Sequence, residues 1–71
     1  MKVGDKVRLT AVPPDLDDHL TELTFRRCLG HEFKVASINS IGYAELQIES
    51  ITGTSGDKIY VSPHFLQVIS K

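Results

Sequence analysis

Short segments in which apolar and polar residues alternate constrain this chain more than any other feature of its sequence. The clearest is YAELQIE at residues 43–49, where Ala44, Leu46 and Ile48 occupy every second position. Because successive side chains of a strand point to opposite faces, a period of two predicts a half-buried β-strand. Similar alternation predicts further short strands at residues 5–12, 31–38, 58–61 and 66–69. The residues expected to face inward are Val7, Leu9, Phe33, Val35, Leu46, Ile48, Ile59, Val61, Leu66 and Val68.

Turn signals separate these strands. The cluster NSIG at 39–42 is expected to join two of them into a β-hairpin. Residues 50–57, which contain two glycines and two threonines, predict a flexible loop. The sequence SPHF at 62–65 predicts one turn of 3₁₀ helix before the last strand.

Residues 16–29 show a helical period instead. Asp17 and Asp18 both suit the N-cap position, and Gly30 suits the left-handed position that follows a helix. The helix is therefore predicted from about residue 19 to residue 29. Its apolar stripe comprises Leu16, Leu20, Leu23, Phe25, Cys28 and Leu29. This stripe either docks on the chain's own strands, which we favour, or forms part of a partner interface.

Length and cysteine content limit the class of protein. Seventy-one residues predict one domain, residues 1–71. The single cysteine, Cys28, excludes an internal disulfide and fits a reducing compartment. The opening MKVGDKV lacks the apolar stretch of a signal peptide, and no apolar run approaches the ~20 residues that cross a bilayer. We therefore expect a cytoplasmic protein that does not contact membranes.

Residues that could carry chemistry are present but do not form a known pattern. Cys28 and His31 have the spacing of half a zinc site, yet no second pair accompanies them. The acidic run at 15–18 lacks the later ligands of a calcium-binding loop, and the glycine loop at 53–58 lacks the Walker spacing. The sequence thus predicts no catalytic residue, no metal site and no cofactor, and a chain that is not an enzyme.

Two stretches resemble SH3-like domains. Residues 4–9, GDKVRL, resemble the first strand of many bacterial SH3-like domains. Residues 59–69 are similar to the end of SH3 domains, where a short strand runs into a Pro-x-x-aromatic turn and a closing strand. Pro63 and Phe65 occupy that neighbourhood. The resemblance implies a mainly β fold, a five-stranded SH3-like barrel with one short helix, at about residues 16–29, inserted between strands 1 and 2.

The resemblance implies a binding function. The first expectation is an adaptor module or accessory subunit that binds another protein and is itself a monomer or weak homo-oligomer. The absence of tryptophan and of an ALYDY-type stretch argues against a groove for proline-rich peptides. The candidate binding residues are Arg26, Arg27, Tyr43, Tyr60 and Phe65.

The alternative is a nucleic-acid or ribosome-associated module, as in KOW-type barrels, which begin with a similar strand. Bases would then stack on aromatic side chains beside Arg26 and Arg27. The formal net charge of −1 and the scattered positions of the eight Lys and Arg residues disfavour this alternative. Retention on heparin would separate the two functions.

Overall fold

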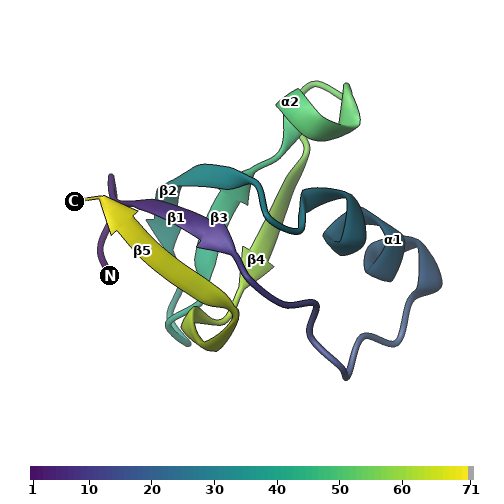
Figure 1. Ribbon diagram of the computed structural model, residues 1–71, viewed down its shortest axis with the longest axis horizontal. Coiled ribbons are helices and arrows are strands. Elements are labelled where there is room, and N and C mark those ends of the chain that lie inside the picture. Colours follow the sequence, from purple (N-terminus) through teal and green to yellow (C-terminus); the bar gives the residue numbers. More distant parts are fainter. Residues whose placement is uncertain (71) are drawn as a thin grey trace.

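The computed structural model describes residues 1–70, in which five strands, two helices and one 3₁₀ turn follow one another (Figure 1). In chain order they are β1 (Lys6–Leu9), α1 (His19–Cys28), β2 (Glu32–Ile38), β3 (Ala44–Gln47), α2 (Glu49–Thr52), β4 (Lys58–Val61), η1 (Pro63–Phe65) and β5 (Leu66–Ser70). The mainly β class and the helix between the first two strands are confirmed, as is the 3₁₀ turn before the last strand.

All five strands belong to one antiparallel sheet, in the order β4-β3-β2-β1-β5. The seven-residue strand β2 joins its two halves. Residues 32–34 pair with β1, and residues 35–38 pair with β3 across a register shift. Within residues 1–70, β4 and β5 are the two edges and do not pair with each other, so hydrogen bonds do not close the sheet.

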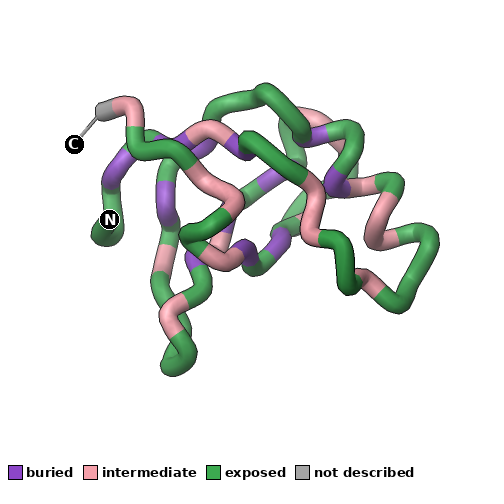
Figure 2. The backbone as a smooth tube through the Cα atoms, turned by 60° about the horizontal axis from the view of Figure 1, so that its bottom comes forward, coloured by how far each residue is buried: buried purple, intermediate pink, exposed green. Residues whose placement is uncertain are grey.

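The core lies between the two halves of the sheet. The inward residues predicted between Val7 and Val61 are all buried, which confirms the alternation from which they were derived. Figure 2 shows most of the buried positions in the strands and at the end of α1, while most of the connecting segments are exposed or half-buried. The complete core comprises Val7, Leu9, Phe25, Cys28, Phe33, Val35, Ala44, Leu46, Ile48, Ile59 and Val61.

The inward prediction is wrong for Val68 and only partly right for Leu66. Val68 stands opposite the buried Val7 and yet remains 37% exposed, and Leu66 is half-buried. Cross-strand partners share a face of the sheet, so Val68 is on the core side. It lies on an edge strand, however, where no further strand covers it.

Helix α1 begins and ends as its sequence predicts. Asp18 is the N-cap: one carboxylate oxygen accepts the Leu20 N–H at 3.0 Å and the other accepts the Thr21 hydroxyl at 3.0 Å. Gly30, with φ of 82°, follows the helix and donates its N–H to the Leu9 carbonyl at 2.8 Å. That bond joins the end of α1 to the end of β1.

The apolar stripe of α1 docks on the strands only at its C-terminal end. Phe25 and Cys28 are buried, and Leu16 packs against the core from the preceding connection. Leu20, Leu23 and Leu29 are 71%, 43% and 44% exposed, so the prediction that the stripe docks is wrong for these three residues. The first turns of α1 extend beyond the sheet, where no strand lies opposite (Figure 1). Neither helix in the described part of the chain has the length and apolar character needed to span a bilayer.

The flexible loop predicted at residues 50–57 is wrong in its first half, because α2 forms there. Gly53, with φ of 77°, ends this helix by donating its N–H to the Glu49 carbonyl. The Glu49 carboxylate accepts the Gly56 N–H at 2.9 Å, and Arg27 donates to the Ile51 carbonyl at 2.9 Å. These contacts stabilise α2, whose residues have low intrinsic helix propensity.

Candidate binding cavity

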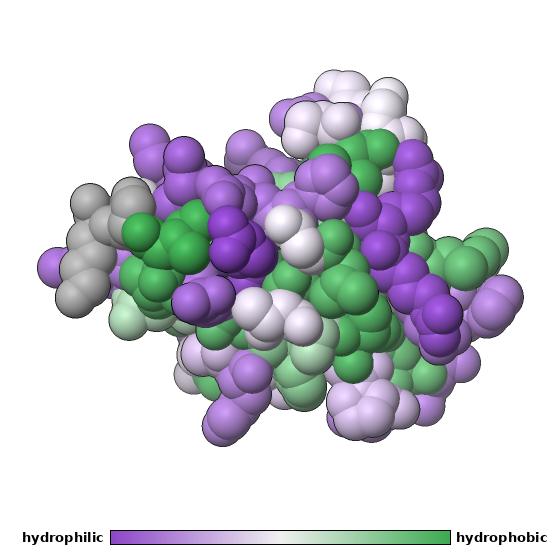
Figure 3. Space-filling model, in the orientation of Figure 1, coloured by the Kyte–Doolittle hydropathy of each residue, from purple (hydrophilic) through white to green (hydrophobic). Residues whose placement is uncertain are grey.

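A cavity of about 880 Å³ lies between the β1–α1 connection, helix α1 and the free edge of β4. Its volume falls within the range of ~300–1,000 Å³ usual for ligand sites. Figure 3 shows apolar surface gathered over the connection from β1 to α1, next to this region. The lining residues are Pro13, Pro14, Asp15, Leu16, Thr21, Thr24, Phe25, Tyr43, Ile48, Asp57, Lys58, Ile59, Tyr60, Ser62, His64 and Phe65.

The β1–α1 connection forms one wall because of where β1 ends. Thr10 donates both its N–H, at 2.9 Å, and its hydroxyl, at 3.1 Å, to the Phe65 carbonyl. Pro13 and Pro14 then prevent the chain from continuing as a paired strand, since proline has no N–H to donate. The connection therefore leaves the sheet beside η1, passes the carboxyl end of β4 and lines the cavity together with β4 (Figure 1).

The 3₁₀ turn supplies the aromatic end of the cavity. The Ser62 hydroxyl caps the turn by accepting the His64 N–H at 3.4 Å, and it lies 3.0 Å from His64 Nδ1. Pro63 occupies the first turn, where a missing N–H costs nothing. The turn holds Phe65 half-buried, packed against the core on one side and lining the cavity on the other.

The two tyrosines of the cavity come from β4, which contains Tyr60, and from the residue directly before β3, Tyr43. The Tyr60 hydroxyl donates to Glu45 Oε1 at 3.3 Å, and the same oxygen accepts the Ser37 hydroxyl at 2.9 Å. The Lys58 ammonium lies 5.9 Å from the centroid of the Tyr60 ring, within the distance of a cation–π contact. Tyr60 is thus held by two contacts and still remains 44% exposed, and Tyr43 is 39% exposed.

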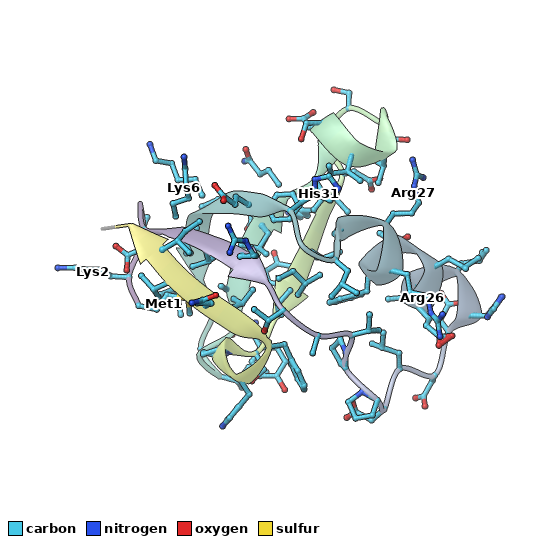
Figure 4. The ribbon with its side chains drawn as sticks, in the orientation of Figure 1. Met1, Lys2, Lys6, Arg26, Arg27 and His31 are labelled. Carbon is cyan, nitrogen blue, oxygen red and sulfur yellow. The ribbon has the colours of Figure 1, made fainter. Side chains whose placement is uncertain are left out.

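The two predicted arginines do not belong to this site. They leave α1 in different directions, Arg26 toward the lower side and Arg27 toward α2 (Figure 4). Arg26 lies 3.5 Å from Glu22 on the next helical turn, and Arg27 donates to the Ile51 carbonyl. The structure therefore brings Tyr43, Tyr60 and Phe65 together and leaves Arg26 and Arg27 outside the cavity.

Sequence reasoning missed the wall that faces the tyrosines. Pro13, Pro14 and Leu16 line the cavity, together with Thr24 and Phe25 of α1. The diproline was interpreted only as the end of a strand. The sequence did contain a signal, because a segment with two prolines cannot pair with the edge of a sheet and so leaves a gap beside it. Where that gap lies, however, depends on the path that the connection takes through space.

Two carboxylates give the cavity a negative side. Asp15 is exposed and Asp57 half-buried, and neither makes an ion pair within residues 1–70. Burial raises the pKa of the Cys28 thiol, Arg27 lowers it and Asp57 raises it further.

Neither a search for metal ligands among residues 1–70 nor comparison with known proteins identifies another site. Among residues 1–70, no three His, Cys, Asp or Glu side chains lie where they could hold a metal ion together. Comparisons with protein-family models, with curated proteins and with solved structures found no match to this chain. The cavity is therefore the candidate site that the chain's own geometry provides.

Proposed function

We propose that this chain is a small binding module that attaches to another protein through the cavity beside β4 and catalyses no reaction. Four phenylalanine and tyrosine side chains, two prolines and a half-buried leucine line that cavity, and this observation carries the proposal. Exposed aromatic residues around a cleft are typical of surfaces that bind proteins. In this proposal the module acts in the cytoplasm as a monomer or weak homo-oligomer, with no cofactor.

The same proposal includes an SH3-like barrel, left open between its edge strands. Support comes from five short strands, from the helix-bearing connection after β1 and from the single 3₁₀ turn between β4 and β5. The proline and the aromatic residue named in the resemblance, Pro63 and Phe65, begin and end that turn.

Charge supports a protein partner over a nucleic acid. Arg8 pairs with Glu32 at 2.7 Å, Arg26 with Glu22, and Arg27 with a carbonyl, so these arginines are already engaged. Figure 4 shows the labelled basic residues spread from the N-terminus to α1. The cavity lining holds two carboxylates, Asp15 and Asp57, against one ammonium group, Lys58, so it offers phosphate no net attraction. Within residues 1–70, Lys58 is the one Lys or Arg that lines the cavity with the tyrosines.

The experiment is a pull-down from native lysate with the tagged full chain, split into nuclease-treated and untreated halves. The double variant Tyr43→Ala/Tyr60→Ala is compared with Ile41→Ala, a control at a 70% exposed residue outside the cavity. We expect a protein that survives nuclease, binds the wild type and the control equally, and is lost with the double variant. Partners that vanish with nuclease would instead support the nucleic-acid module and contradict the proposal.

A further inference from the structure

Strand β4 presents unused backbone groups to the cavity. The Ile48 N–H donates to the Asp57 carbonyl at 3.0 Å, so Ile48 and Asp57 face each other at a hydrogen-bonded position, although the Asp57 N–H itself donates to the Thr54 carbonyl. In an antiparallel ladder such pairs alternate with pairs that make no hydrogen bond to each other. The register pairs Leu46 with Ile59 and Glu45 with Tyr60. Ile59 therefore directs its backbone groups toward β3, and Tyr60 directs its groups away from β3.

By the same alternation Lys58 also points its N–H and carbonyl away from β3. Within residues 1–70, no backbone or side-chain hydrogen bond occupies these groups of Lys58 or Tyr60. Both residues are exposed and both line the cavity. The free edge thus offers two N–H donors and two carbonyl acceptors at the two-residue spacing of a strand, which is the arrangement that pairs with another extended chain.

The sequence explains why this edge stays open. The segment that lines the cavity together with β4 contains Pro13 and Pro14, neither of which has an N–H to donate to a ladder. Beyond them, Leu16 and Phe25 bury their apolar side chains against the core. The chain therefore forms a wall opposite β4 but no strand beside it, and the cavity runs between the two.

We propose that an extended segment of the partner binds in this cavity as a further strand hydrogen-bonded to Lys58 and Tyr60 of β4. This inference rests on the proposed function, since it specifies how the partner protein binds. The cavity, at about 880 Å³, has room for a short extended segment of chain.

The lining of the cavity defines the side chains of that segment. Asp57 directly precedes β4, two residues before Ile59, and its carbonyl accepts the N–H of the buried Ile48, so Asp57 lies on the same inner side as Ile59. The inner face of an added strand would meet the apolar surface of Ile59, Leu16 and Phe25, and would meet the carboxylate of Asp57 at one end. The segment therefore carries apolar residues at alternate positions and a Lys or Arg on the same face, opposite Asp57.

The probe is a phage-displayed library of random linear peptides, selected on the immobilised full chain. We expect enriched peptides with alternating apolar residues and one basic residue in register with them. A synthetic copy of the best peptide is then titrated by fluorescence anisotropy. Asp57→Asn should weaken it about threefold to tenfold, and Ile41→Ala should leave its affinity unchanged.

A matched pair of variants separates backbone pairing from side-chain contact. Tyr60→Pro removes the ring and one edge N–H without removing a bond to β3, whereas Tyr60→Ala removes the ring alone. We expect the proline variant to bind about tenfold more weakly than the alanine variant. Circular dichroism of both variants checks that each is folded.

Amide hydrogen exchange of the wild-type complex gives a result that needs no variant. The amides of Lys58 and Tyr60 should exchange rapidly in the free protein and become protected when the peptide binds. If a peptide binds in the cavity but both amides remain unprotected, the added strand is wrong and the proposed binding function stands. If no peptide is enriched, or those enriched do not need the cavity, both the added strand and the proposed peptide-binding site are wrong.

Discussion

Leu46 at the centre of the sheet is fully buried, whereas Leu20 on α1 is 71% exposed, although both were assigned to apolar faces. The difference lies in what stands opposite each residue. Leu46 pairs with Val35 of β2 and Ile59 of β4, so strands flank it on both sides. Leu20 belongs to the part of α1 that extends past the sheet. An apolar pattern specifies a buried face only where the fold provides a second surface.

The largest expected difference is between the effects on stability of truncating Leu46 in the sheet and Leu20 on α1. Leu46→Ala removes buried methyl groups and leaves a cavity, so the free energy of unfolding should fall by about 2–5 kcal/mol. Leu20→Ala should change it by no more than about 0.5 kcal/mol. Urea unfolding of both variants measures the two values. Similar losses in the two variants would contradict the contrast.

The start of α1 should depend on its cap because packing holds it so little. Asp18→Ala removes the acceptor of the Leu20 N–H and the Thr21 hydroxyl, and should cost about 1 kcal/mol of unfolding free energy. Asp17→Ala is the matched control, since Asp17 makes no capping contact in the described structure. Equal effects of the two substitutions in thermal unfolding would show that Asp18 is not the cap.

Prediction from sequence succeeded where the signal is local. The alternation located the buried residues of β1 to β4, and capping chemistry located both ends of α1. Prediction failed where contacts between distant parts of the chain determine the local structure. Helix α2 depends on bonds from Gly56 and Arg27, and the exposure of Val68 depends on its edge position.

The candidate site, too, could be predicted only in part from the sequence. Tyr43, Tyr60 and Phe65 could be nominated as exposed aromatic residues on strands and a turn. Their grouping in one cavity could not be predicted, because its opposite wall comes from a connection whose path no periodicity describes. Arg26 and Arg27 were grouped with them by sequence adjacency and charge alone, and the helix directs them elsewhere.

An ion pair on the outer surface of the sheet should contribute less to the free energy of unfolding than Leu46 or the Asp18 cap. Arg8 and Glu32 lie opposite each other on β1 and β2, 2.7 Å apart, and both side chains are 41% exposed. A double-mutant cycle with Arg8→Ala and Glu32→Ala should give a coupling energy of about 0.2–1 kcal/mol that decreases with added salt. A coupling that salt leaves unchanged would contradict an exposed pair.

The smallest effect concerns Cys28, where α1 enters the core. Burial raises the pKa of its thiol above 9.0, so the folded state keeps a proton that the unfolded state loses. The contribution to stability is therefore complete below about pH 9 and is lost as the pH rises further. The difference in unfolding free energy between wild type and Cys28→Ala should shrink over that interval. A constant difference would mean that the thiol is not buried.

Residue-resolved amide hydrogen exchange of the free protein shows whether β4 has an open edge beside the cavity. We predict an alternating pattern along β4: slow exchange at Ile59 and Val61, which bond to β3, and fast exchange at Lys58 and Tyr60. Slow exchange at all four amides would show that another segment already covers the edge, and would contradict the account of the site.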